Sequence, residues 1–145
     1  MKHHLHTEIY IDAPPAAVWA VLTDFEAYPE WNPFLQRLEG ALEEGAALRV
    51  TLGLGGSPMR IGPRVVEVRP GHSFAWLGHL WRPGLFDGRH GFILEPQGDG
   101  TRFIHEEHFE GWLVRPILLA AGKDTRLGFE AMNEALKARC ERNPP

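Results

Sequence analysis

Apolar and polar residues alternate along much of the first 111 positions, which is the pattern of β-strands with one buried face. After that point the pattern becomes helical, with apolar residues recurring every three or four positions. Short segments rich in glycine and proline separate the alternating runs, and such segments favour turns. The pattern therefore predicts closely spaced antiparallel strands followed by one long helix.

About seven strands are expected from this alternation. They fall at 3–11, 36–41, 47–54, 63–69, 73–80, 86–95 and 101–111. Glycine and proline mark two of the turns between them, at 53–58 and 96–100.

Two short helices are expected between the first two strands. A Pro-Pro pair suits the first turn of a helix at 16–25, because proline lacks the N–H group that would be unpaired there. A second helical piece is expected at 24–28, ended by Pro29, since the residue before a proline disfavours the helical region. Residues 31–34 are expected to form a loop rich in aromatic side chains.

The long helix is expected at 116–141, with one apolar face. That face carries Leu118, Ala121, Thr125, Phe129, Met132 and Leu136. A curved sheet needs one face covered, and this helix can cover it. Gly122 and Gly128 leave room beside the helix. We therefore expect an α+β fold in which the sheet wraps around the C-terminal helix and encloses a hydrophobic cavity.

Composition narrows the possible functions. The chain has 145 residues, 43% of them hydrophobic, and one domain over residues 1–145 is expected. A net charge of −4 with scattered basic residues argues against nucleic-acid binding. No apolar run approaches the ~20 residues of a membrane helix, so no membrane insertion is expected. Residues 1–6 lack the apolar core of a signal peptide, which favours a cytoplasmic protein, and the single Cys140 excludes an internal disulfide.

The last strand carries the candidate catalytic residues. Its alternation places Phe103, His105, Glu107 and Phe109 on one face, while His90 lies across the preceding turn on the neighbouring strand. Burial can bring the pKa of histidine and of glutamate toward neutral pH. Glu107, His105 and His90 are therefore candidates for a general acid/base set. The alternative is that they are hydrogen-bonded polar groups in the wall of a pocket.

Two groups of histidines raise the question of a metal site. His90, His105 and Glu107 match a two-histidine, one-carboxylate set in residue type. His4 and His6 share one face of the first strand, but no third ligand stands near them in the sequence. We therefore expect no metal and no cofactor, with His4 and His6 as solvated side chains of an edge strand.

Aromatic residues are numerous for this length, and a pocket for an apolar ligand needs such walls. The candidate ligand-binding residues are Trp31, Phe34, Trp76, Trp81, Phe86, Phe92, Phe103, Phe109, Trp112, Phe129 and Met132. Those in turns, notably Trp31, Trp81, Phe86 and Trp112, are the better placed to line an entrance.

An ordered set of segments resembles the START/Bet v 1-like (SRPBCC) superfamily, in particular its bacterial polyketide cyclase/dehydrase and lipid-transport branch. The segments are 11–14, Val18-Trp19, 24–34, 65–68, Pro70-Gly71, Trp76, 86–90, 98–102 and 107–111. Together they span nearly the whole chain. The resemblance implies a helix-grip fold, in which a seven-stranded antiparallel sheet holds a long C-terminal helix with a deep apolar pocket between them. In that comparison, Glu107 matches a recurring acidic position.

The resemblance implies three possible functions. Family members bind lipids, polyketides, sterols and other hydrophobic molecules, so the first hypothesis is binding of a hydrophobic small molecule in the cavity. The second is a cyclase/dehydratase-type enzyme that uses Glu107 with His105 or His90 as acid and base. The third is a chaperone-associated interaction module, which the lack of an obvious charged interface disfavours. The chain is expected to be a monomer or a homodimer.

Overall fold

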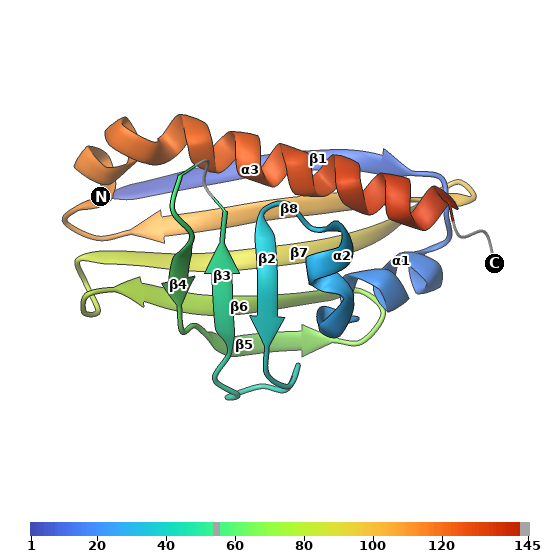
Figure 1. Cartoon of the computed structure of the whole chain (residues 1–145), viewed down its shortest axis with the longest axis horizontal. Coiled ribbons are helices and arrows are strands. Elements are labelled where there is room, and N and C mark those ends of the chain that lie inside the picture. Colours follow the sequence, from blue (N-terminus) through green and yellow to red (C-terminus); the bar gives the residue numbers. More distant parts are fainter. Residues whose placement is uncertain (54–55, 143–145) are drawn as a thin grey trace.

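The larger of the two sheets is antiparallel and five-stranded, in the order β1-β8-β7-β6-β5. The computed structural model describes residues 1–53 and 56–142 (Figure 1). The strands of this sheet are β1 (Lys2–Ile11), β5 (Arg64–Arg69), β6 (Ser73–Leu80), β7 (Phe86–Gln97) and β8 (Gly100–Glu110). Strands β5 to β8 follow one another as a meander, and β1 pairs with the last of them.

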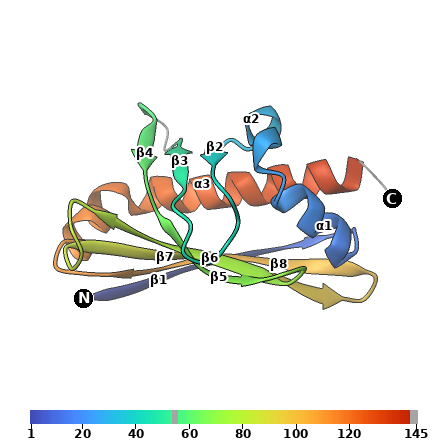
Figure 2. The same cartoon turned by 90° about the horizontal axis from the view of Figure 1, so that it is seen from below.

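A second, three-stranded antiparallel sheet lies over the same face as the long helix. It consists of β2 (Leu35–Glu39), β3 (Arg49–Leu52) and β4 (Met59–Ile61). Figure 1 shows these strands crossing the strands of the larger sheet steeply. Figure 2 shows that they rise on the side where the helix α3 (Val114–Arg142) runs along the sheet. A cavity is therefore possible between the large sheet, α3 and the three-stranded sheet.

The helix α3 is anchored by apolar side chains that face the sheet. Phe129, Met132 and Leu136 are fully buried, one or two turns apart. Directly before Phe129, Gly128 lies against the ring of Phe34, where a Cβ atom would collide with the ring. The volume that the sequence predicts beside Gly128 is therefore filled by an aromatic side chain.

The predicted α+β class, with a curved antiparallel sheet and a long C-terminal helix, is confirmed. The described residues form eight strands rather than about seven. The additional one is β4, whose three residues stand between Pro58 and Gly62 and are too few to show an alternation. The last position of the predicted strand 47–54 and part of the predicted turn 53–58 lie outside the described residues.

The short helices depart from the prediction at Pro29. The first is α1 (Pro15–Leu22), followed by a 3-10 turn, η1 (Phe25–Ala27), and by α2 (Tyr28–Trp31). Pro29 is the second residue of α2 instead of ending a helix, because the N–H groups of the first helical turn have no partner within the helix. Trp31, expected in a loop, is the last residue of α2. None of the described helices is long and apolar enough to cross a membrane.

Candidate functional site

A cavity of about 110 Å³ lies between the central strands of the large sheet, the small sheet and the first half of α3. Its walls are mainly apolar. It is lined by Phe34, Leu52, Met59, Ile61, Trp76, Gly78, His79, Leu80, Phe86, Gly88, His90, Glu107, Phe109, Ile117, Leu118, Ala121 and Thr125. Glu107 supplies the carboxyl group in this lining.

Six of the candidate residues lie in this lining. They are Phe34, Trp76, Phe86, Phe109, His90 and Glu107. Five of them meet because β6, β7 and β8 are neighbours: Trp76 pairs with His90, and His90 with Glu107. The sixth, Phe34, comes from the loop before β2. In an antiparallel sheet, directly paired residues point to the same face.

The other candidates lie outside the lining. Phe92, Phe103, Phe129 and Met132 are fully buried in the solid core, and Trp31 packs partly buried against it. Trp81 and Trp112, expected at an entrance, are 73% and 87% exposed. His105 is also outside, because the ring of His90 stands between it and Glu107.

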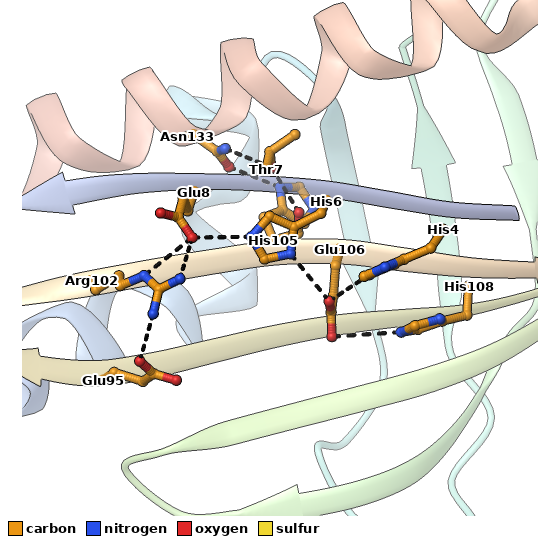
Figure 3. Close-up of polar contacts among 10 residues, drawn as sticks. All are labelled: His4, His6, Thr7, Glu8, Glu95, Arg102, His105, Glu106, His108 and Asn133. Atoms are coloured by element: carbon orange, nitrogen blue, oxygen red, sulfur yellow. Dashed lines mark hydrogen bonds and ion pairs between the residues drawn. The ribbon is translucent and has the colours of Figure 1, made fainter.

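A chain of buried polar groups runs from the cavity wall to the far side of the core. His90 Nδ1 lies 3.4 Å from Glu107 Oε1, and His90 Nε2 lies 2.6 Å from His105 Nε2. His105 Nδ1 lies 2.9 Å from Asn133 Oδ1 on α3. Asn133 Nδ2 donates to Thr7 Oγ1 at 2.9 Å, and the Thr7 hydroxyl donates to the His105 carbonyl at 2.7 Å. Figure 3 shows Thr7, His105 and Asn133 meeting beneath the helix.

The donor and the acceptor of each hydrogen bond in this series can be assigned by starting at the His105 carbonyl. A backbone carbonyl only accepts, so the Thr7 hydroxyl donates to it and accepts from the Asn133 amide. The Asn133 oxygen then accepts from an N–H on His105 Nδ1, which leaves Nε2 of neutral His105 as an acceptor. His90 therefore donates from Nε2 and turns the lone pair of Nδ1 toward Glu107. A protonated Glu107 suits that lone pair, whereas a carboxylate would repel it.

Burial favours the neutral form of each of the three ionisable groups, although it shifts their pKa values in different directions. It raises the pKa of the Glu107 carboxyl from 4.5 to about 8. It lowers the pKa of His105 to about 3, against the opposing effect of hydrogen bonds to the Asn133 side-chain oxygen and the Phe129 carbonyl. It also lowers the pKa of His90 well below its ordinary value, and the nearby His105 adds to this shift. At neutral pH the neutral form of each group is therefore favoured.

Gly88 on β7 makes room for the Glu107 side chain. A Cβ atom at this position would overlap the Glu107 carboxyl. The side chain of Glu107 is 16% exposed, so the carboxyl lies against the strand and still borders the cavity. Gly88 was not among the predicted residues, because a glycine in an alternating strand gives no sign of what packs above it.

Two further members of the polar chain were missed, although the sequence carries a signal for each. Asn133 lies on α3 one turn after Phe129, so it is a polar residue on the apolar face. Thr7 alternates with Leu5 and Ile9 on the inner face of β1. A polar residue in an apolar stripe indicates a buried partner.

The group of described residues that is placed to hold a metal ion lies elsewhere. It consists of His4, His6 and Glu106, on the outer face of the sheet. The two facing nitrogens of His90 and His105 are instead joined to each other in a hydrogen bond. Glu106, on β8, is a third potential ligand that is distant from His4 and His6 in the sequence.

The chain belongs to the polyketide cyclase/dehydrase and lipid transport family, whose model matches residues 2–141. It is thus a member of the START/Bet v 1-like superfamily, as its sequence predicts. A search of the curated proteins gives no significant match.

Solved structures of that superfamily share the fold over nearly the full length. The Zhui aromatase/cyclase from a Streptomyces species is 19% identical with a TM-score of 0.70, and the match covers 98% of this chain and 95% of that one. Norcoclaurine synthase from Thalictrum flavum, solved with dopamine and hydroxybenzaldehyde, is 14% identical with a TM-score of 0.76, covering 100% and 90%. A START superfamily protein from Mycobacterium smegmatis is 21% identical with a TM-score of 0.73, covering 97% and 98%. At these identities the likeness establishes the fold alone.

Proposed function

We propose that the protein binds a small hydrophobic molecule in the cavity between the sheet and α3, and that protonated Glu107 donates a hydrogen bond to an oxygen of that molecule. The observation that carries the proposal is the cavity itself, with apolar walls and one carboxyl group. Small-molecule sites have this character, in which apolar walls supply affinity and a few polar groups fix orientation. Membership of the family supports the same class of ligand.

The size of the cavity limits the part of a ligand that fits without rearrangement. An apolar cavity of about 150 Å³ is known to hold benzene, and the cavity here measures about 110 Å³. A single aromatic ring, or a short stretch of an acyl chain, is therefore the most that the cavity takes without rearrangement. A larger lipid or polyketide requires lining side chains to move.

The role of Glu107 follows from the order of the hydrogen bonds behind it. Because His90 presents a lone pair, the Glu107 proton can turn either to His90 or to a ligand oxygen. A ketone in the cavity would accept this proton in a hydrogen bond, whereas a hydrocarbon of the same shape would not. The protein is therefore expected to prefer the ketone.

Acetophenone and ethylbenzene form a matched pair of probes for this preference. We expect both to bind, with acetophenone about fivefold tighter, as one net hydrogen bond allows. Affinities are measured by titrating each probe into the labelled protein and following chemical shifts. Glu107→Ala should abolish the preference, Glu107→Gln should keep it because an amide N–H also donates, and Glu110→Ala on the opposite face should leave it unchanged. Equal affinity of the two probes for the unaltered protein would refute the role of Glu107.

Acid/base catalysis is the second candidate, favoured by the continuous chain of polar groups behind Glu107. A protonated carboxyl can give its proton to a departing hydroxyl group, and the resulting carboxylate can remove a proton from the adjacent carbon. The substrate then loses water and gains a carbon–carbon double bond, while Glu107 returns to its starting state. A dehydration of an aromatic β-hydroxy ketone would follow this course.

Glu107→Gln separates the two candidates. The variant keeps a hydrogen-bond donor but has no acidic proton, so binding should persist while dehydration of an aromatic β-hydroxy ketone stops. Formation of the conjugated enone is followed by its ultraviolet absorbance. His105→Ala should also reduce turnover, because it removes the partner that orients His90. Unchanged turnover in both variants would exclude acid/base catalysis by this set.

A further inference from the structure

A second cluster of ionisable side chains lies on the outer face of the large sheet, away from the cavity. His4 and His6 project from β1, and Glu106 projects from β8. The register of the two strands explains their meeting, since His6 pairs directly with Glu106 and His4 pairs with His108. The inner and outer faces of β8 thus carry different chemistry, with Glu107 on one and Glu106 on the other.

The geometry of this cluster points to a binding site for a divalent transition metal ion such as Zn²⁺, and we propose His4 Nε2, His6 Nδ1 and Glu106 Oε2 as its ligands. His4 Nε2 lies 2.8 Å and His6 Nδ1 lies 3.5 Å from the same Glu106 oxygen. One candidate ligand atom from each residue lies within 4.8 Å of the others. Zinc bonds of about 2.0–2.2 Å place tetrahedral ligands roughly 3.3 Å apart, so small side-chain rotations suffice.

A second carboxylate already orients one of the proposed ligands. His6 Nε2 lies 3.0 Å from Glu8 Oε2, so with an ion bound the N–H of that nitrogen would be donated to Glu8 and the lone pair of Nδ1 would point to the ion. Glu8 is held in turn by the guanidinium of Arg102, which also contacts Glu95 (Figure 3). A carboxylate behind a histidine is the usual arrangement in metal sites, because it fixes the tautomer and the direction of the ring.

The site is open to solvent on one side. The side chains of His4 and His6 are 45% and 41% exposed, whereas that of Glu106 is 16% exposed. The ring of His108 stacks on that of His4 with centroids 4.0 Å apart, which restricts how His4 can turn. Three protein ligands with an open side leave the fourth tetrahedral position to water.

The ligand types select among metals. Two imidazoles and one carboxylate suit Zn²⁺ and its neighbours in the first transition series. Mg²⁺ and Ca²⁺ prefer sets made of oxygen ligands, and the cluster offers a carboxylate from only one of its three members. Mg²⁺ therefore serves as the matched ion that the site should reject.

A bound ion would join β1 to β8 near the start of the chain. β1 is an edge strand, paired on one side only. An ion that binds the folded state stabilises it by mass action, so the melting temperature should rise with zinc concentration. At a hundredfold excess over Kd, we expect a rise of about 5–10 °C for a chain of this length.

The test is a titration of the full chain, freed of metal with a chelator, with Zn²⁺ by calorimetry and by thermal unfolding. We expect one equivalent bound and a raised melting temperature, with no response to Mg²⁺. His6→Ala and Glu106→Gln should lose both responses, while His3→Ala, a neighbouring histidine outside the cluster, should keep them. Glu8→Gln should weaken binding by about 10–100-fold, as removal of such an outer carboxylate does.

Two results would overturn the proposal. One is the absence of stoichiometric zinc binding to the unaltered chain. The other is binding that His6→Ala and Glu106→Gln leave intact, which would place the ion at other residues. Either result would identify the cluster as hydrogen-bonded surface groups. The cavity proposal would be unaffected, because none of the three proposed ligands lines the cavity.

Discussion

Asn133 determines which nitrogen of His105 carries the proton. Its amide donates to Thr7, so its oxygen must accept from His105 Nδ1. That single assignment sets the order of the remaining donors as far as Glu107. The side-chain amide of Asn133 therefore determines that His90 presents a lone pair to Glu107.

Asn133→Ala should lower the free energy of unfolding by about 1–3 kcal/mol, because it leaves buried polar groups on His105 and Thr7 without their partner. Denaturant unfolding at pH 7 measures the change. The matched control is Glu134→Ala, on the exposed side of the same helical turn, which should stay within about 0.5 kcal/mol of the unaltered chain. Equal effects of the two substitutions would contradict the proposed chain of hydrogen bonds.

The raised pKa of Glu107 should make stability depend on pH. Between 4.5 and about 8 the folded state keeps a proton that the unfolded state has released, so the free energy of unfolding falls as pH rises. The depressed pKa values of His90 and His105 act in the opposite sense, but only below their ordinary value of 6.5. From pH 6.5 to 8 the Glu107 contribution therefore stands alone among these three groups.

From pH 6.5 to 8 the free energy of unfolding should fall by at most about 1.4 kcal/mol per pH unit. Denaturant unfolding at several pH values, with a chelator present, measures it. In Glu107→Gln, which does not ionise, this part of the decline should vanish. A variant that declines as steeply as the unaltered chain would show that Glu107 has an ordinary pKa.

At the scale of elements, the contact between α3 and the loop before β2 decides how closely the helix approaches the sheet. Gly128 lets the ring of Phe34 reach the helix backbone, and Phe34 in turn forms part of the cavity wall. Gly122 lies about two turns earlier on the same helix, where an added Cβ atom would meet only Leu118 at an ordinary 3.6 Å. The two glycines therefore differ in what surrounds them.

Alanine substitutions at these two glycines should have opposite signs. Gly122→Ala should stabilise the protein by up to about 1 kcal/mol, because alanine is the better helix former. Gly128→Ala should destabilise it by about 1–3 kcal/mol, because the methyl group displaces the Phe34 ring. Unfolding free energies of the two variants provide the test, and a stabilising Gly128→Ala would show that the ring does not occupy this space.

The long elements were predictable because each repeats its pattern over many residues. The strands at 73–80 and 101–111 alternate for eight or more positions, and α3 keeps its apolar face over several turns. β4 was not predictable, because three residues carry no period. The place of Pro29 could be interpreted in two ways, since proline both ends helices and begins them.

The site was predictable in part, since strand order brings His90 and Glu107 together. Which aromatic residues would line the cavity depended on how deeply each strand is covered. Phe92 and Phe103 are fully buried in the core, whereas Trp76 and Phe109 border the cavity. Trp81 and Trp112 stand in turns at one end of the sheet and remain exposed. Such differences arise from tertiary packing and leave no local mark in the sequence.

At the scale of the whole molecule, both sheets, the short helices and α3 contribute to one continuous apolar core. Unfolding should therefore be a single cooperative transition. Tryptophan fluorescence, to which the buried Trp76 contributes, and far-ultraviolet circular dichroism should give coincident denaturation curves. Separate midpoints would indicate that part of the chain, such as the three-stranded sheet, unfolds independently.

Ligand binding in the cavity is tested most directly by locating a bound probe there. Acetophenone added to the labelled protein should give nuclear Overhauser effects between its ring protons and the methyl groups of Ile61, Leu80 and Ala121, which belong to the small sheet, the large sheet and α3. These contacts should disappear when an excess of ethylbenzene displaces the ketone. Contacts confined to exposed residues such as Leu119, or none at all, would contradict binding between the sheet and the C-terminal helix.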